Sequence, residues 1–292
     1  MKRIALKIDV DTCQGTLKGV PALTALLKQH EAQATFFFSL GPDVSGRESK
    51  ATSLSRYYGL GTRLYGRFLP APNIGKRCAE ALIETQRAGF EIGIHAWNRV
   101  AWEKNIARAE NTWVEAELAQ ACVRFSEIFA ERANAHAAAG WSMNRHALRL
   151  TQRYAFSYAS DSRGSHPFIP VIDGEIIACP QLPTTLPTLD EILTLEPSYT
   201  AEQAADRLLQ LSSAIAGDHV FTLRAELEGM KFPDIFERLI SGWKSKGFEL
   251  VALRDMRSGL DLDNLPRHSV IFTPPPGRIG PRMTQGPLFL HE

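Results

Sequence analysis

The chain has 292 residues, enough to bury a large core in one domain or in two. Its formal net charge of +1 excludes the strongly basic character typical of nucleic-acid-binding proteins, so we expect no nucleic-acid partner and look for local charge clusters instead. Four scattered cysteines, strand residues that begin at position 4 and the absence of any stretch of about 18 apolar residues predict a cytoplasmic protein with reduced thiols, without a signal peptide or membrane span.

Strand-like and helix-like segments alternate along the chain. Apolar, often β-branched runs predict strands at residues 4–10, 34–40, 90–97, 135–141, 156–161, 219–226 and 248–253. Helical spacing predicts helices at residues 20–30, 79–87, 112–129, 145–154, 201–216 and 233–246, and residues 168–189 contain an Ile-rich strand and a loop. The alternation predicts a parallel sheet with helices outside it. About seven βα units in one domain predict a barrel with functional residues at the carboxyl ends of the strands.

An insertion at about residues 44–75 interrupts this alternation. Between residues 47 and 77, seven basic residues stand against Glu48 alone, and aromatic side chains and leucines lie among them. This composition fits contact with an anionic surface, and it fits equally a solvated loop over the mouth of the barrel.

The end of the chain differs from the rest. Three consecutive prolines and several glycines predict that residues 261–292 form an extended or poorly ordered tail. We therefore expect a barrel domain over residues 1–260, which carries the insertion, followed by this tail.

Two carboxylates close the first predicted strand. Asp9 and Asp11 are two positions apart, so their side chains point the same way, and like charges so close need a cation beside them. His95 lies near the end of the strand at 90–97, and Asp plus His is a normal ligand set for zinc, although a lone His in an apolar strand is more often a core residue. Further polar or aromatic side chains at strand ends are Trp97, Asn98, Trp141, Asp161, Arg163, Arg224, Glu226 and Glu228. The candidate substrate-binding residues among them are Trp97, Trp141, Arg163 and Glu226. The tryptophans also fit a role in packing.

Seven segments, in order and with similar spacing over residues 4–256, resemble the polysaccharide deacetylase (NodB-like) family. They are IDVDT at 8–12, FFFSLGPD at 36–43, EIGIHAW at 91–97, AAAGW at 137–141, YASDSRG at 158–164, QLPTTLPTLDE at 181–191 and LRAELEG at 223–229. Within the family, the chain is most similar to the 4-deoxy-4-formamido-L-arabinose-phosphoundecaprenol deformylases. The resemblance implies an α/β fold of the distorted (β/α)7 barrel type and a hydrolase that removes the formyl or acetyl group from the nitrogen of an amino sugar.

The resemblance also implies roles for single residues. Asp9 matches the general base that activates a water, whereas Asp11 and His95 match ligands of a divalent metal, zinc or similar, that polarises the acyl carbonyl. Asp161 matches the carboxylate that orients the catalytic acid. Lipid-linked members act at the cytoplasmic face of the inner membrane. The implied ligand is therefore an amino sugar or a polyprenyl-phosphate-linked sugar, and the implied location is the cytoplasm or that membrane surface, with the basic insertion contacting anionic headgroups or the phosphate linkage.

Three positions depart from the family pattern. Arg99 stands four residues after His95, where the family has a second histidine ligand, so the third ligand of the metal is lost. Ser142 replaces the arginine that holds the base, and Arg224 replaces the histidine that serves as the acid. An arginine neither ligates a divalent cation nor donates a proton at neutral pH.

Two guanidinium groups carry the same total charge as one divalent metal. We therefore expect Arg99 and Arg224 to occupy the vacated site as permanent cations, which avoids unpaired buried carboxylates that would cost several kcal/mol. We expect Asp161 to be the partner of Arg224. In the alternative, a weaker metal site is completed by His136, His146, His166, Asn98 or water.

Two functions follow from these residues. The first is a metal-assisted hydrolase acting on the N-acyl group of an amino sugar. The alternative is a metal-free, catalytically impaired family member that binds an anionic sugar-phosphate ligand.

Overall fold

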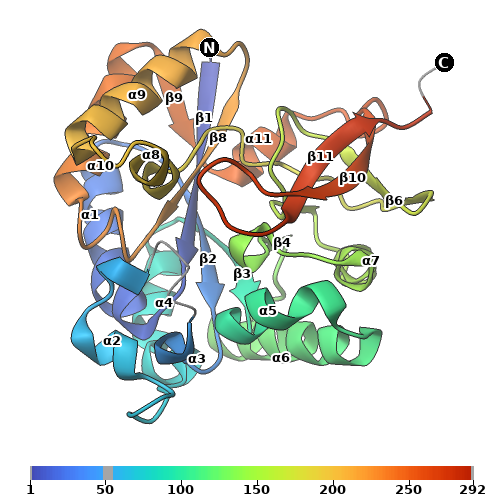
Figure 1. The fold of residues 1–292 in the computed structure, drawn as a ribbon, viewed down its shortest axis with the longest axis horizontal. Coiled ribbons are helices and arrows are strands. Elements are labelled where there is room, and N and C mark those ends of the chain that lie inside the picture. The colour runs from blue at the N-terminus through green and yellow to red at the C-terminus, as the bar shows by residue number, and fades with distance from the viewer. Residues whose placement is uncertain (1, 49–54, 291–292) are drawn as a thin grey trace.

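The computed structural model describes residues 2–48 and 55–290 of the chain (Figure 1). Its main sheet has seven parallel strands, in the order β5-β4-β3-β2-β1-β8, with β9 also paired to β1. The strands are β1 (Lys2–Val10), β2 (Thr35–Ser39), β3 (Glu91–Ala96), β4 (Ala135–His136), β5 (Tyr158–Ala159), β8 (His219–Arg224) and β9 (Phe248–Val251). The predicted parallel sheet is therefore confirmed, and β1, which pairs with three strands, lies at its centre.

The two-residue period of the strands divides the core into two clusters. On β1, Ile4 and Leu6 belong to the main core between sheet and helices, whereas Ala5 belongs to a smaller cluster on the opposite face, inside the curled sheet. On β2, Phe36 packs in the main core and Phe37 in the inner cluster. Because Asp9 has the same parity as Ala5, its side chain belongs to the inner face.

Helices cover the outer face of the sheet (Figure 1). They are α1 (Val20–Gln29), α2 (Leu60–Leu64), α3 (Ile74–Arg77), α4 (Ala79–Arg87), α5 (Arg99–Asn105), α6 (Asn111–Phe129), α7 (Arg145–Arg153), α8 (Leu189–Leu195), α9 (Ala201–Ala214), α10 (Pro233–Ser245) and α11 (Leu253–Ser258). Side-chain caps fix several of their starts: Asn98 accepts a hydrogen bond from the Ala101 amide at 3.1 Å, and Thr188 forms a capping box with Glu191.

The end of the chain forms a second sheet, so the expectation of a poorly ordered tail is wrong for residues 267–288. Strands β10 (Arg267–Thr273) and β11 (Arg282–Leu288) form an antiparallel hairpin that joins β6 (Ile169–Ile172) and β7 (Glu175–Ile176) in the order β11-β10-β6-β7. The prolines and glycines that suggested a tail lie mainly in the connection between the two strands. The predicted domain boundary at residue 260 stays a prediction.

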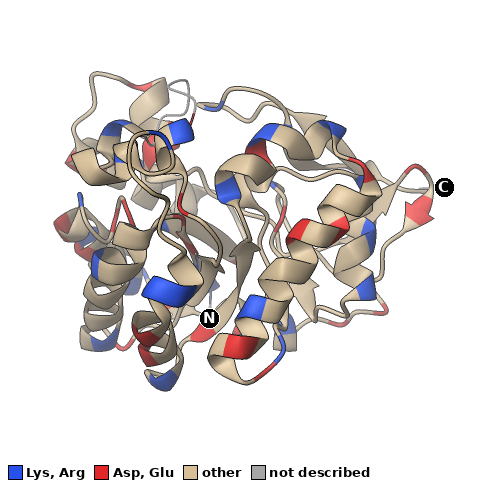
Figure 2. Ribbon diagram, turned by 90° about the horizontal axis from the view of Figure 1, so that it is seen from below, with Lys and Arg blue, Asp and Glu red and all other residues tan. Residues whose placement is uncertain are grey.

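The basic insertion folds into short helical turns and α2, with residues 49–54 outside the described part. Leu60 and Phe68 are 80% and 71% exposed, whereas Tyr58 is buried. Within the described residues, no helix combines the length and apolarity that crossing a membrane requires. Figure 2 shows basic and acidic residues mixed along the helices, in keeping with the net charge of +1.

The hairpin of β10 and β11 makes a testable contribution to stability. Met283 is fully buried in the main core, so Met283→Ala should lower the free energy of unfolding by about 2–5 kcal/mol. Leu288, in the same strand, is 44% exposed, so Leu288→Ala should change the free energy of unfolding by about 0.5 kcal/mol or less. Urea denaturation of both variants checks this. Equally small effects would show that the hairpin does not pack on the core.

Candidate functional site

The candidate site lies where the carboxyl ends of the parallel strands meet. Asp9 and Asp11 come from the end of β1, His95 from β3 and Arg224 from β8. The register places Asp9 directly opposite Arg224, so the sheet itself brings these two side chains together. All four side chains are at most 5% exposed.

Lys7 holds the Asp9 carboxylate and was not predicted. Its Nζ lies 2.9 Å from one Asp9 oxygen and 3.1 Å from the other, and both side chains are buried. Burial lowers the pKa of Lys7, and the neighbouring Asp9 carboxylate opposes that effect. The sequence did carry a signal, because Lys7 is a charged residue inside an apolar strand with the same parity as Asp9 and Asp11. Lys7 thus gives Asp9 the positive partner that the family's arginine, replaced here by Ser142, would have supplied.

Asp11 and His95, the two predicted metal ligands, lie in direct contact. His95 Nε2 lies 3.1 Å from an Asp11 oxygen, while His95 Nδ1 lies 2.7 Å from the carbonyl of Ala137. The contact with the Ala137 carbonyl fixes the orientation of the ring, so that Nε2 faces Asp11.

Two guanidinium groups flank the Asp11 carboxylate. Arg99 Nε lies 3.6 Å from one oxygen and Arg224 Nε lies 3.6 Å from the other. Burial would raise the pKa of Asp11, but the charge of Arg99, with help from His95 and Arg224, outweighs it and holds the pKa well below its usual range. The structure therefore places Arg99 and Arg224 beside Asp11, as the sequence predicts.

Arg99 is held by one carboxylate from the basic insertion and by one from its own helix. It begins α5, which Asn98 caps, and its guanidinium lies 2.8 Å from Glu48 and 3.0 Å from Glu103. Glu48 is the single acidic residue of the basic insertion. Its pairing with a residue 51 positions away could not be read from sequence spacing.

The partner predicted for Arg224 is wrong. Asp161 accepts from the Ala138 amide at 2.7 Å and lies 2.8 Å from His136 Nδ1, so it belongs to another cluster. Arg224 instead lies 3.4 Å from Asp190, on the first turn of α8. A residue from the segment at 181–191 therefore supplies the carboxylate that we had expected from the segment at 158–164.

The four candidate substrate-binding residues differ in access. Trp97 and Arg163 are half-buried, whereas Trp141 is 1% exposed and donates its Nε1–H to Thr184 Oγ1 at 3.0 Å. Glu226 is 4% exposed and accepts hydrogen bonds from the backbone amides of Asp11 and Thr12, so it fixes the turn after β1.

The residues present do not fit a divalent metal. A catalytic zinc needs three protein ligands, and the described residues contain no group of three His, Cys, Asp or Glu side chains that could hold one. The predicted replacements lie elsewhere: His136 pairs with Asp161, and His166 lies 3.1 Å from His268. Two permanent cations instead flank Asp11.

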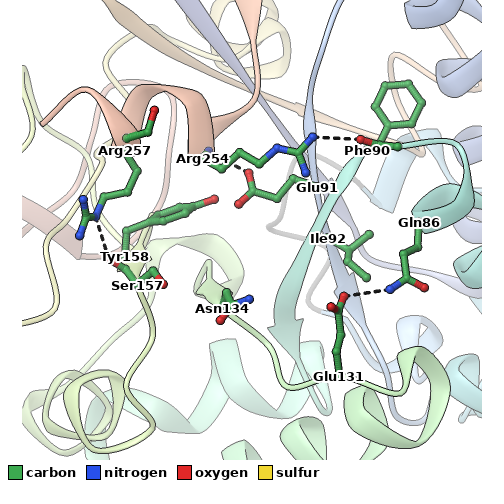
Figure 3. A pocket seen from close by; sticks show the side chains of 12 residues that line it. Gln86, Phe90, Glu91, Ile92, Glu131, Asn134, Ser157, Tyr158, Arg254 and Arg257 are labelled. Atoms are coloured by element: carbon green, nitrogen blue, oxygen red, sulfur yellow. Dashed lines mark hydrogen bonds between the residues drawn. The ribbon is translucent and has the colours of Figure 1, made fainter.

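An open pocket of about 680 Å³ lies away from these residues. Figure 3 shows walls that include Glu91 at the start of β3, Tyr158 at the start of β5, and Arg254 and Arg257 of α11. These are the amino ends of the strands, where barrel residues contribute to stability rather than to chemistry.

Carboxylates and a histidine at the carboxyl ends of parallel strands are typical of a barrel hydrolase, and comparison with known proteins gives the family. The family profile described as polysaccharide deacetylase matches residues 2–159, more than half of the chain. The chain belongs to the polysaccharide deacetylase family, a family of hydrolases that is in general metal-dependent.

Two curated relatives and one solved structure cover most of the chain. Proteins named probable 4-deoxy-4-formamido-L-arabinose-phosphoundecaprenol deformylase are 33% identical in Shewanella sediminis, over 89% of this chain and 88% of that one, and 30% identical in Wigglesworthia glossinidia brevipalpis, over 91% and 96%. A polysaccharide deacetylase structure from Mycobacterium smegmatis superposes with a TM-score of 0.66 at 17% identity, over 94% of this chain and 95% of that one. The predicted distorted (β/α)7 barrel is thereby confirmed.

Glu228 should make stability depend on pH. Burial, reinforced by Asp190, raises its pKa to about 8, although its carboxylate accepts from the Arg224 amide at 2.8 Å. Because the folded carboxyl keeps its proton to higher pH than the unfolded one, its contribution is fully present below about pH 4 and is lost as the pH rises toward 8. Glu228→Gln mimics the protonated form, so the variant should lose less stability than wild type between about pH 5 and 8 in urea titrations.

The control for this measurement is Glu249→Gln, the same change at an exposed position on β9. Its stability should follow the wild-type pH curve. Parallel curves of stability against pH for Glu228→Gln and wild type would contradict the assignment of Glu228 as a protonated group.

Proposed function

We propose that the chain acts on the formyl or acetyl group of an amino sugar carried on polyprenyl phosphate, as a hydrolase of a non-peptide carbon–nitrogen bond. The observation that carries this proposal is the identity of 30–33%, over about nine tenths of this chain, to proteins named as deformylases of such a sugar. Asp9, Asp11 and His95 at the matching positions support it.

Two side chains support the chemistry without a metal. Both Asp9 oxygens contact Lys7 Nζ, at 2.9 and 3.1 Å, and the remaining lone pairs of the carboxylate can accept a proton from an attacking water. Arg224 Nε is a buried donor without a hydrogen-bond partner, and it can donate to the acyl oxygen as negative charge develops there. We assign no side chain to protonation of the leaving amine, since Arg224 stands at the position of the acid. Turnover should therefore be slow.

Binding without turnover is the second candidate function. The observation that favours it is the flanking of Asp11 by Arg99 and Arg224, each 3.6 Å away. Such a site keeps its charge at every physiological pH and recognises an anionic ligand, but it lacks an exchangeable metal-bound water.

Formate release tests the two functions. With a formamido sugar on undecaprenyl phosphate, wild-type protein should release formate slowly, and EDTA or added zinc should leave the rate unchanged. Asp9→Asn should reduce the rate at least 100-fold, because the amide cannot accept the proton. The matched control is Asp206→Asn, an exposed carboxylate paired with Arg238, which should keep the wild-type rate.

Other outcomes separate the alternatives. Saturable binding of the same substrate without formate release would favour the second function. Turnover that requires added zinc would contradict the metal-free account, and neither binding nor release would exclude both functions.

We further propose that the insertion contacts an anionic membrane surface, which would bring the site to a lipid-linked sugar. Exposed Leu60 and Phe68 lie among Arg56, Arg63 and Arg67, a mixture of apolar and basic groups suited to a bilayer interface. The Arg67 guanidinium lies 5.1 Å from the Phe68 ring centroid.

Liposome co-sedimentation tests this contact. Replacing Arg56, Arg63 and Arg67 by Gln should weaken binding to phosphatidylglycerol vesicles at least tenfold, because each basic residue near such a surface contributes about 1 kcal/mol. The control replaces Arg87, Arg153 and Arg238, exposed arginines on other helices, by Gln and should bind like wild type. Unchanged sedimentation of the first variant would contradict a membrane role for the insertion.

A further inference from the structure

We propose that the guanidinium groups around Trp141 form a phosphate-binding subsite, and that the connection between β10 and β11 supplies part of it. The subsite consists of Trp141, Arg163, Arg224 and Arg278. The inference rests on the proposed function, because the phosphate it would hold is the one that links the sugar to its polyprenyl carrier.

Three guanidinium groups from distant parts of the chain meet at one aromatic ring. The Cζ atoms of Arg163, Arg278 and Arg224 lie 5.0, 5.4 and 5.9 Å from the centroid of Trp141. Arg163 follows β5, Arg224 ends β8, and Arg278 lies in the connection between β10 and β11, which reaches toward α8 in Figure 1. Trp141 is fixed beneath them by its hydrogen bond to Thr184.

The three guanidinium groups share two carboxylates on α8, and Arg224 has a third, Asp11. Arg278 takes the shortest contacts, at 2.9 Å to Asp190 and 3.0 Å to Glu191. Arg163 and Arg224 share the same two carboxylates at 3.4 Å each, from Glu191 and Asp190 respectively. Three positive groups thus share two negative ones on α8, although Arg224 also lies 3.6 Å from Asp11.

A hydrogen-bond donor remains unused in the subsite. Arg163 Nη1 is buried and has no hydrogen-bond partner. Arg224 Nε is also buried without a partner, but the proposed hydrolysis assigns it to the acyl oxygen, so Arg224 contributes its charge to the phosphate site. Burying such a donor without an acceptor costs about 1–3 kcal/mol, which a ligand oxygen would recover. Phosphate oxygens are the acceptors that guanidinium groups bind most readily.

Mutual repulsion of the guanidinium groups also favours the binding of an anion. Burial lowers the pKa of Arg163, and the positive charges of Arg278 and Arg224 lower it further, with Glu191 and Asp190 opposing them. Burial also lowers the pKa of Arg282, the first residue of β11; Glu103 opposes this effect, and the charges of Arg278 and Arg224 add to it. An anion bound among these groups would relieve the repulsion.

The connection between β10 and β11 is built to approach α8 closely. Gly277 has a φ of +78°, and a Cβ at this position would lie 2.9 Å from the carbonyl oxygen of Glu191, so the close approach requires glycine. The next residue, Arg278, reaches Thr188, Asp190 and Glu191. Arg282 Nη1 lies 3.4 Å from the Oγ of Ser142, the residue that replaces the family's arginine.

Calorimetric titration with inorganic phosphate and with dimethyl phosphate tests the subsite without any need for turnover. Wild-type protein should bind both, and Arg163→Gln and Arg278→Gln should each weaken binding at least tenfold. Glu191→Gln should tighten it at least threefold, because it removes a competing carboxylate while a Gln at this position preserves the helix cap. Arg238→Gln, an exposed arginine of α10, should bind like wild type.

Arg278→Lys guards against loss of folding, since it keeps the positive charge but not the planar fork, and it should bind phosphate more tightly than Arg278→Gln. Absence of phosphate binding by folded wild-type protein, or equal affinity of wild type, Arg163→Gln and Glu191→Gln, would overturn the subsite. Because formate release is measured separately, failure of the subsite and failure of the proposed hydrolysis are distinguishable.

Discussion

The neutralisation of two buried carboxylates is the constraint on which this site depends. Asp9 and Asp11 are at most 2% exposed, and an uncompensated buried charge costs several kcal/mol. Lys7 neutralises the Asp9 carboxylate at 2.9 Å, and Arg99 and Arg224 neutralise that of Asp11. These cations need anions in turn, and the chain brings Glu48 and Glu103 to Arg99 and Asp190 to Arg224. The departures from the family pattern therefore form one connected network rather than isolated losses.

A network of fixed charges has different chemical abilities from a metal centre. A divalent ion accepts electron pairs and carries an exchangeable water, whereas a guanidinium group only donates hydrogen bonds and contributes a permanent charge. It can stabilise an oxyanion or hold a phosphate, but it cannot generate a hydroxide nucleophile. Recognition of an anionic ligand is thus easier for this site than rapid hydrolysis. Asp9, whose carboxylate can accept a proton beside Lys7, is the residue through which hydrolysis would have to proceed.

The features that the sequence predicted are those that a local pattern of residues determines. The main strands and helices appeared as apolar runs and helical periods, and the alternation of strands placed Asp9, Asp11 and His95 at one edge. Glu48 and Asp190 were not predicted, because each reaches its arginine from 51 or 34 positions away, and only the folded chain brings them together. The hairpin of β10 and β11 was missed since its prolines outweighed the β-branched residues of β10. Lys7 could have been predicted, because its parity matches that of the two carboxylates.

The start of α8 connects the stability of the fold to the charge of the site. Thr188 and Glu191 form a capping box, so the first turn of α8 is fixed by its own hydrogen bonds. Asp190 and Glu191 lie in that turn, and through Arg278 they also hold the connection between β10 and β11. A change that loosened the cap would release Arg278 and leave Arg224 with Asp11 as its nearest carboxylate. The second sheet is therefore part of the architecture of the barrel mouth, because Arg278, in its connection between β10 and β11, is positioned by two carboxylates that a single helix turn presents.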